Sequence, residues 1–526
     1  MKILTHPAML ALGLAILCLM VLIGPFVAPS HLILYHFNSS ISPLVLSILL
    51  NVFVLWLILT SLFVWARSPG WPRIFIWSAV ALNIPWILLK NYAILAGWPM
   101  PHGLSVAVFA GCMMALVSLL FLFSRRPAFL VFFEQMQHLL ATLLGFAALS
   151  GLFILSQLLW FAWHAWLFNI PHPLHQSQMR SSIHHPKTRV IWVLLDELSY
   201  QQVYEQRFPG LKLEAFDQLA AQSTVFTHVI PAASFTEIAV PSMMAGIPVD
   251  RVSSSSSGLL SLHNARTNRW QAFDPHQTIF QDALNTGYST GVAGWYNPYC
   301  RILPSVLDRC FWTDGVFVGL YAGQPLGKVL LAPSLRFYDG AKSLFRGRIR
   351  GERYADLDAR LHIADLKDVS RAADQLLEDP SINFIFLHLP VPHPGGIYDR
   401  TTASFTIHNS SYIDNLALAD KSFAHLRHLL EQNGTWDSSA IVVMGDHSWR
   451  TTLLWSDSFV WTPEDQAASH GGQFDDRPAY IVKLPNQQNP ARIDDRFDAV
   501  RTRALLDGII TNSIKTPEDL AAWVRK

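Results

Sequence analysis

The feature that most limits how this chain can fold is a set of long apolar stretches in its first third. A membrane-spanning helix needs about 20 consecutive apolar residues. Five stretches meet this requirement, and they cover residues 7–27, 43–66, 74–94, 104–123 and 139–161. The first lacks the small-residue cleavage site of a secretory signal, so we interpret it as a retained helix. We therefore predict a five-helix transmembrane domain at residues 1–168.

Basic residues in the short loops predict the orientation of these helices. Arg67 and Arg73 lie between the second and third stretches, and Arg125 and Arg126 lie between the fourth and fifth. Lys2 precedes the first stretch, whereas the other two loops contain neither Lys nor Arg. Because cytoplasmic loops are enriched in Lys and Arg, we expect a cytoplasmic N-terminus. Five spans of a bacterial inner-membrane protein would then place the rest of the chain in the periplasm or outside the cell.

The remainder of the chain has the composition of a water-soluble domain. Residues 169–189 contain several Pro and His residues without apolar periodicity, which predicts a periplasmic linker before a domain at residues 190–526. Charged residues make up 15% of the chain and its net charge is +1, so no basic surface for nucleic acid is expected. Cys300 and Cys310 lie in the exported part, where oxidation is permitted, and we predict that they form a disulfide.

An acidic pair follows the most apolar segment of this second domain. Residues 190–195 read VIWVLL and are followed by Asp196 and Glu197. A continuous apolar run predicts a parallel strand that is buried on both faces. Chemistry in open α/β sheets collects at the carboxyl ends of such strands. The pair therefore predicts either a divalent cation site or a carboxylate that caps the next helix.

A hydroxyl-rich segment follows at residues 226–248. Its small residues and its Pro predict a loop that leads into a helix beginning near Thr236. A hydroxyl at a helix N-terminus can cap the helix or act as a nucleophile beside free backbone N–H groups. Ser234 and Ser242 are the rival hydroxyls in this segment.

Further strands and helices alternate along the chain. The predicted elements are a helix at residues 279–288, strands at 289–294 and 383–389, a helix at 412–432, and strands at 440–444 and 479–484. His393 follows one strand between two prolines, and Asp446 and His447 follow another after a glycine. This alternation predicts an α/β domain with a mostly parallel central sheet. An Asp beside a His is a common ligand pair for zinc or manganese.

The ordered set of these motifs resembles the alkaline phosphatase and sulfatase superfamily. It is most similar to the membrane-anchored branch that contains phosphoethanolamine transferases, phosphoglycerol transferases and lipoteichoic acid synthases. The resemblance covers roughly residues 190–485 and implies a sulfatase-like catalytic domain. One departure is Ala239, which occupies the position where sulfatases have Cys or Ser, so the resemblance argues against an ordinary formylglycine sulfatase.

The resemblance also implies roles for individual residues. Thr236 would be the nucleophile and, with His393 and His470, would form the catalytic set. Arg301 and Arg477 would contact the transferred group. One divalent metal ion would be bound, with zinc or manganese favoured and calcium or magnesium left open. Its expected ligands are Asp196, Thr236, Asp446 and His447, with Glu197 as a second carboxylate ligand or as an orienting group.

These implied roles favour a membrane-bound transferase. It would move a phospho-alcohol head group from a phospholipid donor to an envelope glycan or lipid through a phospho-threonine intermediate. A hydrolase of sulfate or phosphate esters is the alternative within the enzyme class. A non-catalytic membrane scaffold is the alternative from another class.

Overall fold

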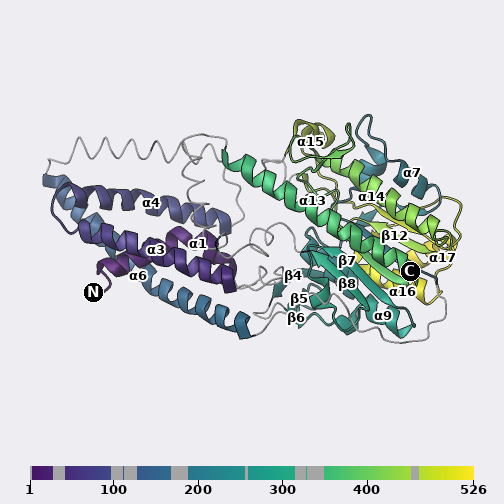
Figure 1. Ribbon diagram of the computed structural model, residues 1–526, viewed down its shortest axis with the longest axis horizontal. Helices are drawn as coiled ribbons and strands as arrows, with labels where there is room; N and C mark the ends of the chain where they lie inside the picture. The colour runs from purple at the N-terminus through teal and green to yellow at the C-terminus, as the bar shows by residue number, and fades with distance from the viewer. Residues whose placement is uncertain are drawn as a thin grey trace. The chain divides into compact units, whose positions relative to one another are not determined.

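The computed structural model describes residues 3–27, 42–95, 111, 127–167, 188–254, 259–313, 327, 349–451 and 461–526. The chain divides into two compact units, one built from the N-terminal helices and one built around the central sheet (Figure 1). The boundaries predicted at residues 168 and 189 stay predictions.

The first unit contains four described helices. These are α1 (Pro7–Val27), α3 (Ser42–Trp65), α4 (Trp71–Leu95) and α6 (Pro127–Leu167). Helix α1 packs against both α3 and α6. The packing against α6 is close, because a Cβ atom on Gly13 would lie 2.2 Å from the carbonyl oxygen of Leu144. Only glycine permits this approach of the two backbones.

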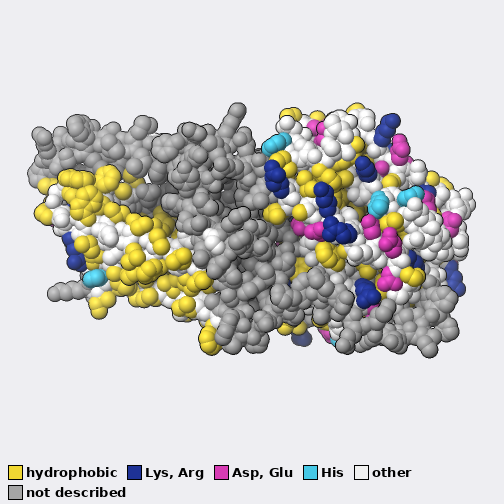
Figure 2. Space-filling model, viewed as in Figure 1, with side chains coloured by type: hydrophobic (Ala, Val, Ile, Leu, Met, Phe, Trp, Pro, Cys, Tyr) yellow, Lys and Arg dark blue, Asp and Glu magenta, His cyan; other side chains and the backbone are white. Residues whose placement is uncertain are grey.

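The five predicted spans are matched only in part by this unit. Helices occupy four of the predicted stretches, and the stretch at 104–123 lies outside the described residues. Among the described helices, two are long and apolar enough to cross a membrane, at Val45–Trp65 and Leu130–Trp160. Pro7–Met20 and Trp71–Leu82 form shorter apolar helices. Figure 2 shows hydrophobic side chains over the described surface of this unit and a mixture of charged and apolar side chains on the other.

The second unit is built on an eight-stranded sheet whose order is β14-β2-β13-β12-β1-β9-β7-β8. All pairings are parallel except those of β13 with β12 and with β2. The mostly parallel sheet predicted from the sequence is therefore confirmed. The strands are β1 (Val190–Leu195), β2 (Thr224–Phe226), β7 (Thr290–Trp295), β8 (Arg309–Thr313), β9 (Phe384–Leu389), β12 (Ala440–Met444), β13 (Tyr480–Lys483) and β14 (Ala491–Ile493).

Both faces of the sheet are covered, which explains the continuous apolar runs of its strands. On one face, Ile191, Val193 and Leu195 of β1 join a core with α7 (Glu214–Ala220), α13 (Ile349–Glu378) and α14 (Tyr412–Gln432). On the other face, Trp192 packs on Phe386, which contacts Phe280 of α9 (Ile279–Asn285). Successive side chains of β1 therefore enter opposite cores.

The sequence-based prediction located most central elements but missed some of the others. Helix α14 has the predicted bounds, whereas α9 ends three residues early, before Gly287 with φ 81°. The 30-residue helix α13 was not predicted. A separate three-stranded sheet consists of β4 (Val249–Ser254), β5 (Leu260–Asn264) and β6 (Arg269–Ala272). Two further strand pairs are β3 (Val229–Ile230) with β15 (Phe497–Asp498), and β10 (Tyr398–Asp399) with β11 (Ser404–Phe405). The other α-helices of this unit are α8 (Thr236–Ala245), α10 (Tyr299–Ile302), α15 (Pro463–Ala468), α16 (Thr502–Ile510) and α17 (Pro517–Val524).

The structure contains the disulfide between Cys300 and Cys310, which joins α10 to β8. Replacing both cysteines by serine should lower the free energy of unfolding by about 2 to 3 kcal/mol, because the closed loop is short. Urea denaturation of the full-length protein in detergent would measure this loss. A Cys18→Ser variant is the control, since Cys18 is a free cysteine. An unchanged unfolding midpoint for the double variant would contradict the expectation.

Candidate metal centre

Three parallel strands end side by side at the candidate site. Strand β1 lies between β9 and β12, with Leu195 opposite Leu389 and Leu194 opposite Met444. The residues just after β1 and β12 therefore lie at the same sheet edge. Asp196 follows β1, and Asp446 follows β12 after one glycine. Both carboxylates are fully buried.

The glycine between β12 and Asp446 allows these two strand ends to approach closely. A Cβ atom on Gly445 would lie 2.7 Å from the carbonyl oxygen of Leu198. This approach lets the backbone N–H of Glu197 donate to Asp446 Oδ1 at 3.1 Å. Glu197 itself adopts a φ of 62°, so the chain turns sharply directly after Asp196. The turn leaves the Asp196 and Asp446 side chains in one buried region.

Thr236 is the first residue of α8, and its hydroxyl lies at this site. The residue before the helix, Phe235, makes no side-chain cap, and Thr236 Oγ1 lies 3.3 Å from His447 Nε2. These contacts support the role of nucleophile for Thr236 over the role of helix cap. The rival hydroxyl of Ser242 donates to the Ile247 carbonyl near the other end of the helix, and Ser234 is exposed.

The imidazole of His447 has the tautomer that a metal ligand needs. Its Nδ1 lies 3.1 Å from the carbonyl oxygen of Ser448, which can only accept, so Nδ1 carries the proton. The lone pair of Nε2 then faces Thr236 Oγ1 and lies 3.1 Å from Asp446 Oδ2. Ligand atoms on one tetrahedral ion with bonds of about 2.0 to 2.2 Å lie roughly 3.3 to 3.6 Å apart. The observed separations are close to this range.

Burial and neighbouring charged groups shift the pKa values of Asp196 and Asp446 in opposite directions. Burial, and then the neighbouring carboxylates Asp446 and Glu197, raise the pKa of Asp196 well above its ordinary value. Burial also acts to raise the pKa of Asp446, but His447, His388 and the Thr236 hydroxyl outweigh it and leave that pKa below its usual value. Both oxygens of Asp196 and Asp446 Oδ2 have no hydrogen-bond donor among the described residues.

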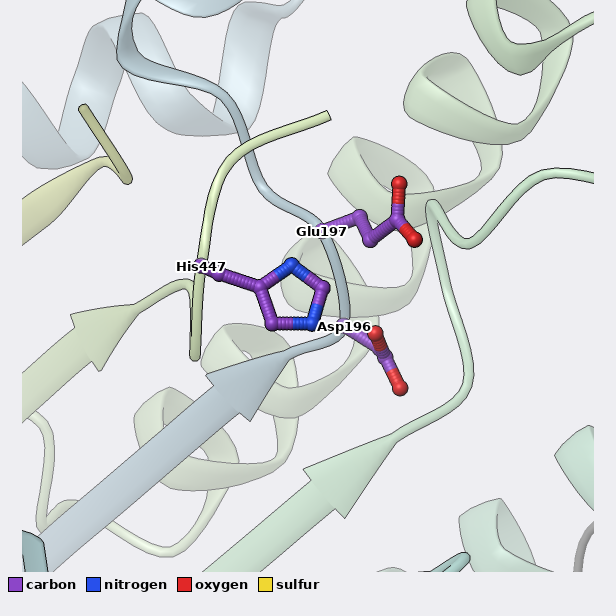
Figure 3. A group of neighbouring side chains, drawn as sticks. All are labelled: Asp196, Glu197 and His447. Atoms are coloured by element: carbon purple, nitrogen blue, oxygen red, sulfur yellow. The ribbon is translucent and has the colours of Figure 1, made fainter. Parts of the chain in front are cut away.

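Buried oxygens without donors fit a divalent cation, which would satisfy them directly. Asp196, Glu197 and His447 each place a ligand atom within 4.8 Å of the others. Figure 3 shows the three side chains beside one another beyond the ends of two strands, with the ring of His447 turned toward Asp196. Asp196 and His447, together with Asp446 and Thr236 beside them, are the residues that would hold the ion, and Glu197 is the remaining candidate ligand.

Glu197 has a strong competing partner in Arg450, four residues beyond Asp446. The guanidinium donates to Glu197 Oε1 through Nε at 2.9 Å and also through Nη2. A further guanidinium nitrogen, Nη1, donates to the Ser234 carbonyl at 3.2 Å. These contacts favour an orienting role for Glu197, and its role as a metal ligand stays a prediction. The ion pair ties the end of β1 to the loop before Thr236.

His393 reaches the same site from the loop after β9. Its Nε2 lies 4.0 Å from Glu197 Oε1, and its Nδ1 lies 2.9 Å from the carbonyl oxygen of Pro394. Asn415 of α14 donates to the His393 carbonyl at 2.7 Å, and Tyr412 of the same helix donates to the Glu197 carbonyl at 2.7 Å. The first turn of α14 thereby holds two active-site loops.

Three predicted residues make contacts outside this cluster. Arg477 pairs with Asp475 and Glu205, so its cationic group already has carboxylate partners. Arg301 lies over the ring of Trp312. His470 is exposed and makes no hydrogen bond or ion pair with the site residues that the structure describes. Their proposed contacts with the transferred group stay predictions.

Sequence reasoning missed two buried residues of the site, Arg450 and His388. His388 lies in β9 with its Nε2 3.6 Å from Asp196 Oδ2, and burial lowers its pKa to about 4. An imidazole inside the apolar run FIFLHL was a signal that could have identified it. Arg450 offered no such pattern, since it follows the strand in a loop.

Replacing Asp196 by Asn should remove the bound metal, because it exchanges a charged carboxylate ligand for a neutral amide. A divalent ion at 100 times its Kd should stabilise the wild-type protein by about 2.7 kcal/mol and leave the variant unchanged. Elemental mass spectrometry and thermal unfolding with and without chelator would measure both effects. Asp494→Asn, at an exposed carboxylate, is the control. Wild-type metal content in Asp196→Asn would contradict the assignment.

Comparisons with known proteins were made for the whole chain. A search of curated protein sequences finds no significant match. Among solved structures, the lipoteichoic acid synthase LtaP from Listeria monocytogenes is 13% identical, with 66% of this chain and 78% of that chain covered and a TM-score of 0.37. The phosphonate monoester hydrolase of Agrobacterium radiobacter is 12% identical, with 62% and 74% covered and a TM-score of 0.38.

The family comparison covers the whole candidate site. The sequence model of the Sulfatase family matches residues 188–485, which is more than half of the 526-residue chain. The matched range contains β1, the Thr236 segment, the His393 loop and the Asp446–His447 pair. This chain therefore belongs to the sulfatase family, within the alkaline phosphatase and sulfatase superfamily.

Proposed function

We propose that this protein is a metal-dependent, membrane-bound transferase that moves a phospho-alcohol head group from a lipid to an envelope acceptor. The observation that carries the proposal is the position of Thr236 Oγ1, 3.3 Å from His447 Nε2 at the N-terminus of α8. Members of the superfamily are metal-dependent phosphoester or sulfate ester hydrolases and transferases.

The first half-reaction forms a covalent intermediate on Thr236. Asp196, Asp446 and His447 would hold a divalent cation, zinc or manganese, which lowers the pKa of the Thr hydroxyl and offsets phosphoryl charge when bound. Thr236 Oγ attacks phosphorus, and the bond between phosphorus and the diacylglycerol oxygen breaks. Diacylglycerol leaves with a proton, and the head group stays on Thr236 as a phosphodiester.

The second half-reaction transfers the group to the acceptor. His393 donates through Nδ1 to the Pro394 carbonyl, so in this tautomer Nε2 is the basic nitrogen that would take the proton of an acceptor hydroxyl. The acceptor oxygen then attacks phosphorus, the bond to Thr236 Oγ breaks, and Thr236 Oγ receives the proton that His393 took. The backbone N–H groups at the start of α8 and the positive end of its dipole favour the anionic group throughout.

The N-terminal unit supports transfer over hydrolysis. Its two long apolar helices would keep the catalytic unit beside the bilayer, where a phospholipid donor is reached directly. Under the predicted orientation, the acceptor would be a glycan or lipid of the envelope on the periplasmic side. The donor head group would be phosphoethanolamine or phosphoglycerol.

Thr236→Ala should abolish transfer by several orders of magnitude, because it removes the nucleophile. Purified full-length protein would be incubated with vesicles of phosphatidylethanolamine and phosphatidylglycerol, and its intact mass would be recorded. A mass increase equal to one head group, mapped to Thr236, is the expected result, and Thr236→Ala should show none.

Ser234→Ala is the matched control, since it removes the exposed hydroxyl two residues earlier and should keep the adduct. The transferase proposal would be abandoned if the wild-type protein formed no adduct and instead released free sulfate from a model ester. Purified wild-type protein without any bound divalent ion would favour a non-catalytic scaffold.

A further inference from the structure

His388 is a buried imidazole for which the reaction proposed above has no use. It lies in β9 with no exposed surface, and its neighbour in strand β1 is Leu194, two residues before Asp196. Its Nε2 lies 3.6 Å from Asp196 Oδ2, and neither atom has a hydrogen-bond partner among the described residues. A buried polar atom without a partner is costly, so this pairing needs a reason.

The opposite nitrogen of His388 is held by Tyr299. The phenol oxygen lies 2.6 Å from Nδ1, and Asn297 Nδ2 donates to that same phenol oxygen at 3.4 Å. An amide N–H can only donate, so this contact leaves the phenol O–H able to donate to Nδ1, and the Trp295 backbone is a further polar neighbour of the ring. A neutral imidazole that accepts at Nδ1 carries its proton on Nε2, which is the nitrogen that faces Asp196.

The position of Tyr299 is itself enforced by close packing. A Cβ atom on Gly294 would lie 2.3 Å from the Tyr299 ring, so the strand residue opposite His388 must be glycine. Tyr299 is fully buried, and the next residue, Cys300, is tied to Cys310 of β8. The ring therefore has little freedom to leave Nδ1.

We propose that Tyr299 and His388 form a positioning chain that directs Nε2–H at Asp196 Oδ2, closes the 3.6 Å separation to a hydrogen bond when a metal is bound, and so orients this carboxylate toward the metal. The chain runs from Asn297 through the Tyr299 hydroxyl and the His388 ring to Asp196 Oδ2. One oxygen of Asp196 then accepts from Nε2–H, and the other remains for the cation. Hydrogen bonds of this kind to ligating carboxylates tune metal affinity. The inference rests on the metal-binding role given to Asp196 in the proposed function.

The test compares two substitutions of His388 in the full-length protein. His388→Leu removes the donor and should weaken zinc binding by about 10 to 100-fold. His388→Gln places an amide N–H near the position of Nε2 and should bind zinc nearly as tightly as wild type. Tyr299→Phe removes the O–H donor and should weaken binding to a smaller extent. Competition with a chromophoric chelator measures each Kd, and manganese is tested in the same way.

His263→Leu is the control, since His263 is also buried but lies in β5 and pairs with Asp250. It should leave zinc affinity unchanged. Thermal unfolding of each metal-free variant checks the fold. If His388→Leu does not fold, the comparison of wild type with His388→Gln and Tyr299→Phe still decides the question.

Wild-type zinc affinity in both His388→Leu and Tyr299→Phe would overturn the inference, as would an equal loss in the Gln and Leu variants. X-ray absorption of the zinc-loaded wild type should show one imidazole ligand, His447. Two imidazoles would overturn the positioning role, because His388 would then be a ligand itself. If the wild-type protein binds no divalent ion, the proposed function is refuted as well. If the wild-type protein binds zinc and substitutions of His388 leave the zinc affinity unchanged, this inference alone is refuted.

Discussion

The site depends on the burial of three carboxylates at one sheet edge with a single arginine among them. Arg450 is engaged by Glu197, and among the described residues no hydrogen-bond donor reaches either oxygen of Asp196 or Oδ2 of Asp446. Burial, and then the neighbouring carboxylates Asp446 and Glu197, raise the pKa of Asp196. Placing like charges together in a buried region costs free energy, and a divalent ion is the partner that offsets it.

The surrounding fold turns these charges into an ordered site. Gly445 lets the ends of β1 and β12 touch, and the Glu197 N–H then binds Asp446. Arg450 connects the turn after β1 to the loop before Thr236, and α14 holds both that turn and the His393 loop. Each loop is therefore fixed by at least one hydrogen bond from a separate element. This is the rigidity that in-line transfer requires.

The chain joins this site to a strongly apolar N-terminal unit. The apolar surface of its helices and the mixed surface of the sheet unit differ as expected for lipid-facing and water-facing parts (Figure 2). A catalytic unit held beside a bilayer acts on lipid substrates without extracting them. The apolar N-terminal helices and the position of the Thr236 hydroxyl thus support the same proposal from separate parts of the chain.

The sequence alone predicted an apolar helical part and an α/β part, because hydrophobic patterning is a local property. Apolar runs identified β1, β9 and β12, helical spacing identified α14, and acidic or imidazole residues after strands pointed to Asp196, Asp446 and His447. Helix α13 was missed, and so were the contacts of residues whose partners are remote in sequence. Arg450 pairs with Glu197 across 253 residues, and Arg477 is occupied by Glu205 and Asp475.

Only the tertiary structure decided which of these groups meet. It showed that Glu197 pairs with Arg450, whereas the oxygens of Asp196 have no hydrogen-bond donor among the described residues. It also showed that Tyr299 packs against His388 in the space that Gly294 leaves open. The physical reason is that side-chain roles at a buried site depend on distance, direction and the count of donors. These quantities are set by strand order and register, which no local pattern contains.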